Sequence, residues 1–197
     1  MGLRVLVADD EPMIRLGLRA MLEGQGYEVV GEADNGRGAV ELARATAPDL
    51  IILDIRMPHM DGLEAARAIM AERPTAILLL TAYADRELVE KAKGCGVLAY
   101  LVKPFREADL VPAMEIAVAR FQELQALQKE AGTLRDALEA REIIERAKRI
   151  LMARLGLSEG EAFRRIRRLS MNSRKPMKQV AEAILLAALP EEERPER

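Results

Sequence analysis

The sequence predicts an α/β protein with a doubly wound, five-stranded parallel sheet, followed by a helical linker and a small all-α bundle of three helices. Three observations support this prediction. Five short apolar runs alternate with segments of helical periodicity in the first part of the chain. The runs are apolar almost throughout, which is typical of parallel strands that helices cover on both faces. The remaining part of the chain has helical periodicity throughout.

The apolar runs predict strands and the periodic segments predict the helices that connect them. Strands are expected over residues 3–8, 28–32, 50–53, 76–80 and 99–102. Helices are expected over residues 13–22, 38–46, 62–72 and 86–95, and a further helix starts near residue 107. Ligands of such sheets bind at the carboxyl ends of the strands, so the residues that follow each strand are candidates for chemistry.

Composition narrows the classes of function. The chain has 197 residues, of which 50% are hydrophobic and 31% charged, which excludes a disordered or fibrous protein. A single cysteine, Cys95, excludes a disulfide framework, and a single histidine, His59, argues against histidine-based catalysis or a zinc site. Neither a long apolar run nor a signal-peptide pattern occurs, so we expect a cytoplasmic protein without a membrane partner.

Polar side chains follow four of the predicted strands. They are Asp9, Asp10 and Glu11 after the first strand, Asp54 after the third, Thr81 after the fourth and Lys103 after the fifth. All of them are expected to meet at one edge of the sheet. Oxygen ligands without histidine or cysteine favour Mg²⁺. A carboxylate beside the metal can act as nucleophile toward a phosphoryl group, whose oxygens the lysine and the hydroxyl would hold.

Positions 1–121 resemble the receiver domain of two-component response regulators. The matching strings are VADDEP, LDIRMPHMDG, LLTAYAD and YLVKPF. The resemblance implies a flavodoxin-like fold, a sensor histidine kinase as partner and Mg²⁺ as cofactor. It also implies a regulatory phosphoacceptor rather than an enzyme, although one that promotes its own dephosphorylation.

The same resemblance assigns roles to individual residues. It implies that Asp54 is the phosphorylated aspartate and that Asp9 and Asp10 are the acidic metal pair. The metal would also take the backbone carbonyl of Arg56. The remaining roles are a switch hydroxyl, a switch aromatic and a lysine that pairs with the phosphoryl group, which correspond to Thr81, Tyr100 and Lys103.

Residues 122–133 are predicted to form a helical linker. Apolar residues recur at three and four positions, first as Met114, Ala117, Phe121 and Leu124, and then in a shifted phase as Leu127, Ala131, Leu134 and Leu138. This heptad-like pattern predicts a homodimer through the linker helix, while a helix packed on its own receiver is the alternative. A helix break at Gly132, with Thr133 as a cap, is a second alternative.

Residues 134–189 are predicted to form a three-helix bundle, followed by a loose charged tail at residues 190–197. The first helix is expected over residues 133–153. Ser158 and Glu161 form a capping box at the start of the second, and Pro176 marks the start of the third. Phe163 is assigned to the bundle core. This segment has 13 lysines and arginines but only 7 acidic residues, which favours contact with a polyanion.

Residues 141–185 resemble the ANTAR domain of transcription antitermination regulators. The string REIIERAKRILMARLGLSEGEAFRRIRRLSMNSRKPMKQVAEAIL carries the resemblance, which implies binding to an RNA hairpin and prevention of premature termination. The expected RNA-binding residues are Arg146, Lys148, Arg149, Arg167, Arg168, Asn172, Ser173, Arg174 and Lys175. Asn172 and Ser173 are expected to read bases from the turn between the last two helices.

Two other functions compete with a phosphorylation-controlled antiterminator. A DNA-binding transcription factor would need a helix-turn-helix with a short turn, whereas residues 171–175 separate the last two helices. A protein-interaction adaptor is compatible with the composition. RNA selection would separate these alternatives, because electrostatic RNA binding weakens with salt.

Overall fold

The computed structural model describes residues 2–82, 97 and 99–188. The chain divides into two compact units, Met1–Ala126 and Leu127–Arg197, which we call the N-terminal and the C-terminal unit. The predicted helix over residues 86–95, Cys95 within it and the predicted tail over residues 190–197 lie outside the described residues.

The N-terminal unit contains the predicted five-stranded parallel sheet. The strands are β1 (Arg4–Ala8), β2 (Glu28–Ala33), β3 (Leu50–Asp54), β4 (Ala76–Thr81) and β5 (Ala99–Val102). They are arranged in the order β2-β1-β3-β4-β5, and every neighbouring pair is parallel. The strand order reverses between β1 and β3, which is where a doubly wound sheet places its ligands.

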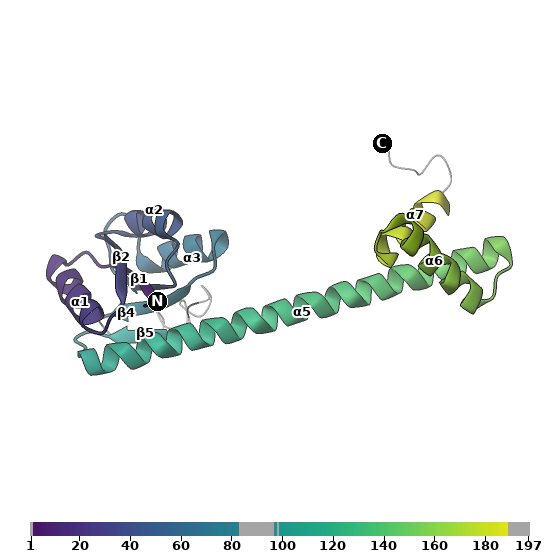
Figure 1. Cartoon of the computed structure of the whole chain (residues 1–197). Coiled ribbons are helices and arrows are strands. Elements are labelled where there is room, and N and C mark those ends of the chain that lie inside the picture. The colour runs from purple at the N-terminus through teal and green to yellow at the C-terminus, as the bar shows by residue number, and fades with distance from the viewer. Residues whose placement is uncertain (1, 83–96, 98, 189–197) are drawn as a thin grey trace. The chain divides into compact units, whose positions relative to one another are not determined.

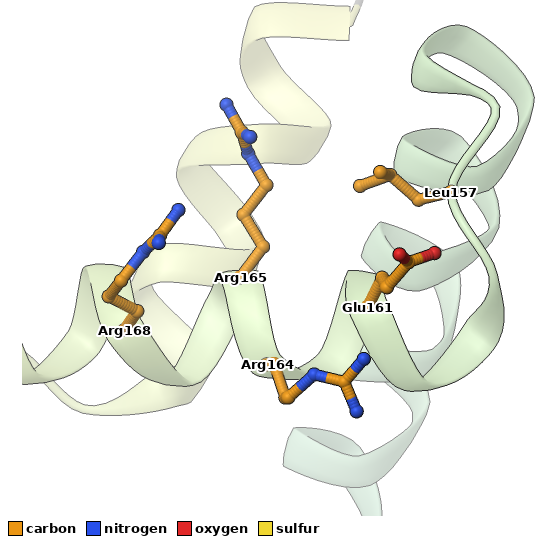
Figure 2. A pocket seen from close by; sticks show the side chains of 5 residues that line it. All are labelled: Leu157, Glu161, Arg164, Arg165 and Arg168. Atoms are coloured by element: carbon orange, nitrogen blue, oxygen red, sulfur yellow. The ribbon is translucent and has the colours of Figure 1, made fainter.

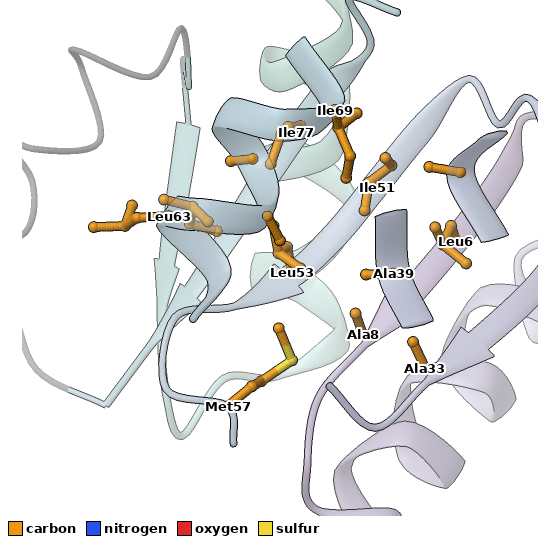
Figure 3. Packing of buried hydrophobic residues seen from close by; sticks show 14 of the residues in the cluster. Leu6, Ala8, Ala33, Ala39, Ile51, Leu53, Met57, Leu63, Ile69 and Ile77 are labelled. Atoms are coloured by element: carbon orange, nitrogen blue, oxygen red, sulfur yellow. The ribbon is translucent and has the colours of Figure 1, made fainter. Parts of the chain in front are cut away.

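Helices cover both faces of this sheet (Figure 1). α2 (Gly36–Thr46) and α3 (Gly62–Glu72) pack on one face, where Leu6 and Ala8 of β1 point into a core that Figure 3 shows. α1 (Pro12–Gly24) and the first turns of α5 (Glu107–Leu155) pack on the other face with Val5 and Val7. The alternation of side chains along β1 explains why the strand is apolar at every position from Val5 to Ala8.

α5 (Glu107–Leu155) is one continuous helix of 49 residues. It passes through Gly132, so the break considered there does not occur. The Thr133 hydroxyl donates a hydrogen bond back to the carbonyl of Glu130 within the helix instead of capping a new one. A glycine costs a helix only about 1 kcal/mol relative to alanine, too little to interrupt it.

The C-terminal unit is a three-helix bundle formed by the end of α5, α6 (Glu159–Ser173) and α7 (Met177–Ala188). The predicted capping box is present, because Ser158 and Glu161 bond reciprocally at the start of α6. Ala162 and Ile166 are fully buried, whereas Phe163 is 41% exposed. The assignment of Phe163 to the core was wrong, because it is turned about 100° from Ala162 around the helix.

Among the described residues, no helix has both the length and the apolar character that are needed to cross a membrane.

Candidate functional site

The sheet brings three carboxylates together at the carboxyl ends of β1 and β3. Asp54 is the last residue of β3, and it is buried. Asp9 follows β1 and is also buried, while Asp10 is exposed. Carboxylate oxygens of these three residues lie within 4.8 Å of one another. The expectation from the strand ends therefore holds for all three side chains.

Lys103 connects two of these carboxylates. Its Nζ lies 2.9 Å from Asp54 Oδ1 and 2.6 Å from Asp9 Oδ2. The Lys103–Pro104 peptide bond is cis, and the backbone N–H of Lys103 donates to the carbonyl of Thr81 at 2.7 Å. Lys103 thus holds a positive charge between the two buried aspartates.

Burial and charge act against each other on Asp54. Burial raises the pKa of the Asp54 carboxyl above its ordinary value, and Lys103 opposes this by favouring the charged form. The negative charges of Asp9 and Asp10 add to the rise. Burial also disfavours the charged ammonium, but the contacts with Asp9 and Asp54 outweigh it, so the pKa of Lys103 is raised. A further positive charge at this site would therefore favour the ionised form of Asp54.

The carboxylate group fits Mg²⁺. The backbone N–H of Glu11 donates to Asp9 Oδ1 at 3.0 Å and fixes the orientation of this carboxylate. Mg²⁺ takes oxygen ligands, uses one or two carboxylates and keeps several waters. The exposure of Asp10 leaves the site accessible to such waters. Arg56 is exposed in the segment after β3, and the role of its carbonyl stays a prediction.

The two predicted switch residues differ in exposure. Thr81 ends β4 and is buried, one position beyond Leu80, which pairs with Asp54. Tyr100 lies on the edge strand β5 and is 48% exposed. Their positions are compatible with the predicted switch, but their movement stays a prediction.

Gly62 lies against the backbone of Asp54 and Ile55, because the chain turns back after β3. Its N–H donates to the carbonyl of Ile55 at 2.8 Å, and Asp61 caps α3 by accepting from the N–H of Glu64. A Cβ atom on Gly62 would lie 2.0 Å from the carbonyl oxygen of Asp54. Only glycine allows this approach of two backbone segments.

Lys148 departs from the expected RNA-binding role. Its side chain is buried, and Nζ lies 2.7 Å from Glu159 Oε1 and 2.9 Å from Glu145 Oε1. Two carboxylates neutralise this ammonium, so it ties α5 to the first turn of α6 and is not available to an RNA phosphate. The expectation failed because residue type and clustering do not show which lysine faces a carboxylate from another helix.

The predicted turn residues also need correction. Asn172 and Ser173 lie in the last turn of α6, not in the turn after it. The Ser173 hydroxyl donates to the carbonyl of Leu169 at 2.6 Å, which uses its one donor. Arg174 ends the helix in the left-handed conformation, and Lys175 follows it. Both of these basic residues are exposed.

The remaining predicted arginines do not share one helix face. Adjacent residues of a helix are about 100° apart, so Arg167 and Arg168 point in different directions. Arg146 and Arg149 are exposed on α5. Arg149 stands two residues from both Ala147 and Leu151, which are buried, and therefore projects away from the bundle core.

A pocket on the C-terminal unit was not predicted from the sequence. It is an open surface depression of about 390 Å³, lined by Leu157, Glu161, Arg164, Arg165 and Arg168 (Figure 2). Glu161, Arg165 and Arg168 are spaced by four and three residues, which places them on one face of α6. That spacing is the signal that could have revealed the group.

Comparisons with known proteins match both units. Residues 5–115 match the family model for the response regulator receiver domain, and residues 132–185 match the model for the ANTAR domain. Transcriptional regulatory protein PdtaR of Mycobacterium tuberculosis is 50% identical over 182 residues, which cover 92% of this chain and 89% of that protein. Chemotaxis protein CheY of Thermotoga maritima is 40% identical over 115 residues, or 58% of this chain and 96% of that protein.

Solved structures also resemble the chain. The receiver domain of the putative response regulator NarL from Mycobacterium tuberculosis has a TM-score of 0.55 and 40% identity. This match covers 57% of this chain and 92% of that structure.

Proposed function

This chain belongs to the two-component response regulators that join a receiver domain to an ANTAR domain, and we propose that Asp54 is its phosphoacceptor. As a member of this family it acts as a transcription antiterminator, with a kinase as phosphodonor and RNA as the bound nucleic acid. The contact of Lys103 with both Asp9 and Asp54 is the observation that carries the proposal.

We assign the phosphoryl transfer to a carboxylate oxygen of Asp54. This oxygen forms a bond to phosphorus as the phosphorus–nitrogen bond of a histidine kinase's phosphohistidine breaks, and the histidine keeps the electron pair. Lys103 is placed to hold the new phosphoryl oxygens, because it already contacts Asp54 Oδ1. Mg²⁺, held by Asp9, Asp10, Asp54 and the Arg56 carbonyl, would neutralise charge on the transferred group. The same site would later promote hydrolysis of the acyl phosphate.

Phosphorylation replaces the single negative charge of the Asp54 carboxylate by a phosphoryl group with a charge of about −2, which would draw the Thr81 hydroxyl and the Lys103 ammonium together. We propose that Tyr100 then changes its exposure and that the change reaches α5 through residues 107–121. The proposed domains are a receiver over residues 1–121, a linker over 122–133 and an RNA-binding bundle over 134–189. We place the protein in the cytoplasm, where the nascent RNA is met.

We propose that the linker pairs two copies of the chain. Leu127, Leu134 and Leu138 are 57%, 59% and 62% exposed on α5. They recur at seven and four residues, the spacing at which apolar side chains of two helices interlock. A second copy of the same helix would cover this exposed apolar row.

The proposed RNA surface consists of exposed basic residues and Asn172. They are Arg146, Arg149, Arg167, Arg168, Arg174 and Lys175, while Lys148 is no longer included. We propose an RNA hairpin as the ligand, because sequence-specific RNA recognition depends on single-stranded loops whose bases are splayed out.

The phosphoacceptor is tested by intact-protein mass after incubation with acetyl phosphate and Mg²⁺. The wild type should gain one phosphoryl group, and Asp54→Asn should gain none. Asp61→Asn serves as a control, because Asp61 caps α3 and lies outside the carboxylate cluster. Persistence of the adduct in Asp54→Asn would overturn the assignment.

A further inference from the structure

We propose that the pocket lined by Leu157, Glu161, Arg164, Arg165 and Arg168 holds a single unpaired RNA nucleotide, its base and its phosphate. The inference rests on the proposed RNA binding and goes beyond it, because it assigns base recognition to residues outside the predicted RNA-binding set. Only Arg168 belongs to both groups.

The charge and the volume of the pocket indicate the class of ligand. Three guanidinium groups against one carboxylate favour an anion. A pocket of about 390 Å³ lies near the lower end of the range for small-molecule sites, about 300–1,000 Å³. It is too small for a duplex but suited to one nucleotide that leaves the stack.

The pocket offers a surface for the base. Figure 2 shows Leu157 pointing into the space beside Arg165, while Arg165 and Arg168 both extend from the same side of α6. The chain contains no tryptophan and only three phenylalanines and three tyrosines, so aromatic stacking is scarce. Guanidinium planes can replace aromatic rings as stacking partners for RNA bases. A base between Arg165 and Leu157 would have a planar cation on one side and an apolar side chain on the other.

Glu161 is the polar group of the pocket that would distinguish one base from another. Its Oε2 accepts from the N–H of Ser158 at 2.9 Å and from the Ser158 hydroxyl at 2.6 Å, so the carboxylate is held in place. These bonds keep the pKa of Glu161 below its ordinary value, which makes it an acceptor at neutral pH. Within the described part of the chain, no hydrogen bond or ion pair reaches Glu161 Oε1. A base amino group can donate to this oxygen, whereas a free phosphate would be repelled by it.

The pocket continues along α6 toward a predicted base reader. Arg165, Arg168 and Asn172 are spaced by three and four residues, so they form one row on the helix. Asn172 is exposed and can both donate and accept hydrogen bonds. A loop strand lying along this row would place one nucleotide in the pocket and the next beside Asn172.

The test uses the full chain, phosphorylated with acetyl phosphate and Mg²⁺, and a pool of RNA hairpins with a randomised loop. A hairpin selected by the wild type is then measured against Arg165→Lys, which keeps the charge but removes the planar group. Arg135→Lys is the matched control, because Arg135 is an exposed arginine of the C-terminal unit outside the pocket. We expect about a tenfold loss of affinity for Arg165→Lys and no loss for Arg135→Lys.

Glu161→Gln gives an independent arm. Glutamine can still complete the capping box, so α6 should remain folded, which circular dichroism would check. The selected hairpin should bind this variant more weakly than it binds Glu142→Gln, a change at an exposed carboxylate on α5. The losses of RNA affinity in Arg165→Lys and Glu161→Gln should both disappear when one particular loop base is replaced by an abasic site.

The outcomes separate the two proposals. If the wild type selects no hairpin, the proposed RNA binding fails. If the wild type binds but Arg165→Lys and Glu161→Gln bind equally well, RNA binding stands and the pocket inference is overturned. Losses that persist with an abasic site at every loop position would also overturn it, because the pocket residues would then act on the backbone alone.

Discussion

The Lys103 ammonium balances the two buried carboxylates of the proposed phosphorylation site. Nζ lies within 3 Å of both Asp9 and Asp54, and burial raises the pKa of Asp54. Replacing Lys103 by methionine would leave like charges unpaired in a region of low dielectric. Breaking a buried ion pair in this way costs about 3–5 kcal/mol, less where solvent reaches the site.

The pH dependence of that cost follows from the sign of the shift. A carboxyl whose folded-state pKa is raised favours folding when protonated, and this contribution is lost as pH rises through the folded-state value. The free energy of unfolding of Lys103→Met should therefore fall below that of the wild type at neutral pH and approach it on acidification. Urea titrations followed by circular dichroism measure the free energies of unfolding of the wild type and of Lys103→Met at each pH. A deficit that does not change with pH would contradict this account.

Gly62 tests whether the backbone around Asp54 tolerates a side chain. Gly62→Ala places a methyl group 2.0 Å from the Asp54 carbonyl oxygen, so the melting temperature and the extent of phosphorylation should both fall. Gly17→Ala in α1 is the control, because its Cβ would meet no described atom within 4 Å. It should be neutral or stabilise the helix by up to about 1 kcal/mol. Equal behaviour of the two variants in thermal melts would refute the steric argument.

Among the helices, the contact between α5 and α6 depends on ionised glutamates. Hydrogen bonds from Lys148 lower the pKa of Glu159, so its contribution to stability is fully present above the ordinary carboxyl pKa and is lost as pH falls through the lowered folded-state pKa. Glu159→Gln should lower the melting temperature of the C-terminal unit at neutral pH, and this deficit should disappear once pH lies below the folded-state pKa. Glu142→Gln should change neither value. A deficit of Glu159→Gln that persists in acid would contradict the ion-pair interpretation.

The linker row gives a test of pairing. Leu134→Glu introduces a charge into the exposed apolar row of α5, and it should convert a dimer into a monomer in sedimentation equilibrium. Gln128→Glu adds the same charge at another exposed position of α5, and it should leave the mass unchanged. A wild type that stays monomeric with acetyl phosphate and RNA present would refute the proposed homodimer.

Apolar patterning predicted the elements well, because four of the five parallel strands are almost wholly apolar and helices begin with local signals. The capping box at Ser158 and Glu161 is such a signal, and the structure contains it. The alternation of strands and helices also predicted a doubly wound parallel sheet. The carboxyl ends of its strands share one edge, which is why the carboxylates meet. Contacts between side chains of different helices could not be predicted from the sequence. The burial of Lys148 depends on Glu159 across a helix contact, and the exposure of Phe163 depends on which flank of α6 packs against the bundle.

At the scale of the whole molecule, the proposed phosphorylation switch and the ANTAR domain lie in separate units of the chain. Control requires that phosphorylation and RNA binding favour the same state of the protein, since a modification shifts an equilibrium only by its differential effect on two states. By reciprocity, RNA bound to the C-terminal unit should also favour the phosphorylated receiver.

The most direct test is the affinity of the full chain for a selected RNA hairpin, measured at one salt concentration with and without acetyl phosphate and Mg²⁺. The account predicts tighter binding after phosphorylation, by about 5–150-fold for a typical coupling of two sites. Asp54→Asn should bind with the unphosphorylated affinity under both conditions. Equal affinities of the phosphorylated and unphosphorylated wild type, with the adduct confirmed by mass, would contradict the proposal that Asp54 controls RNA binding.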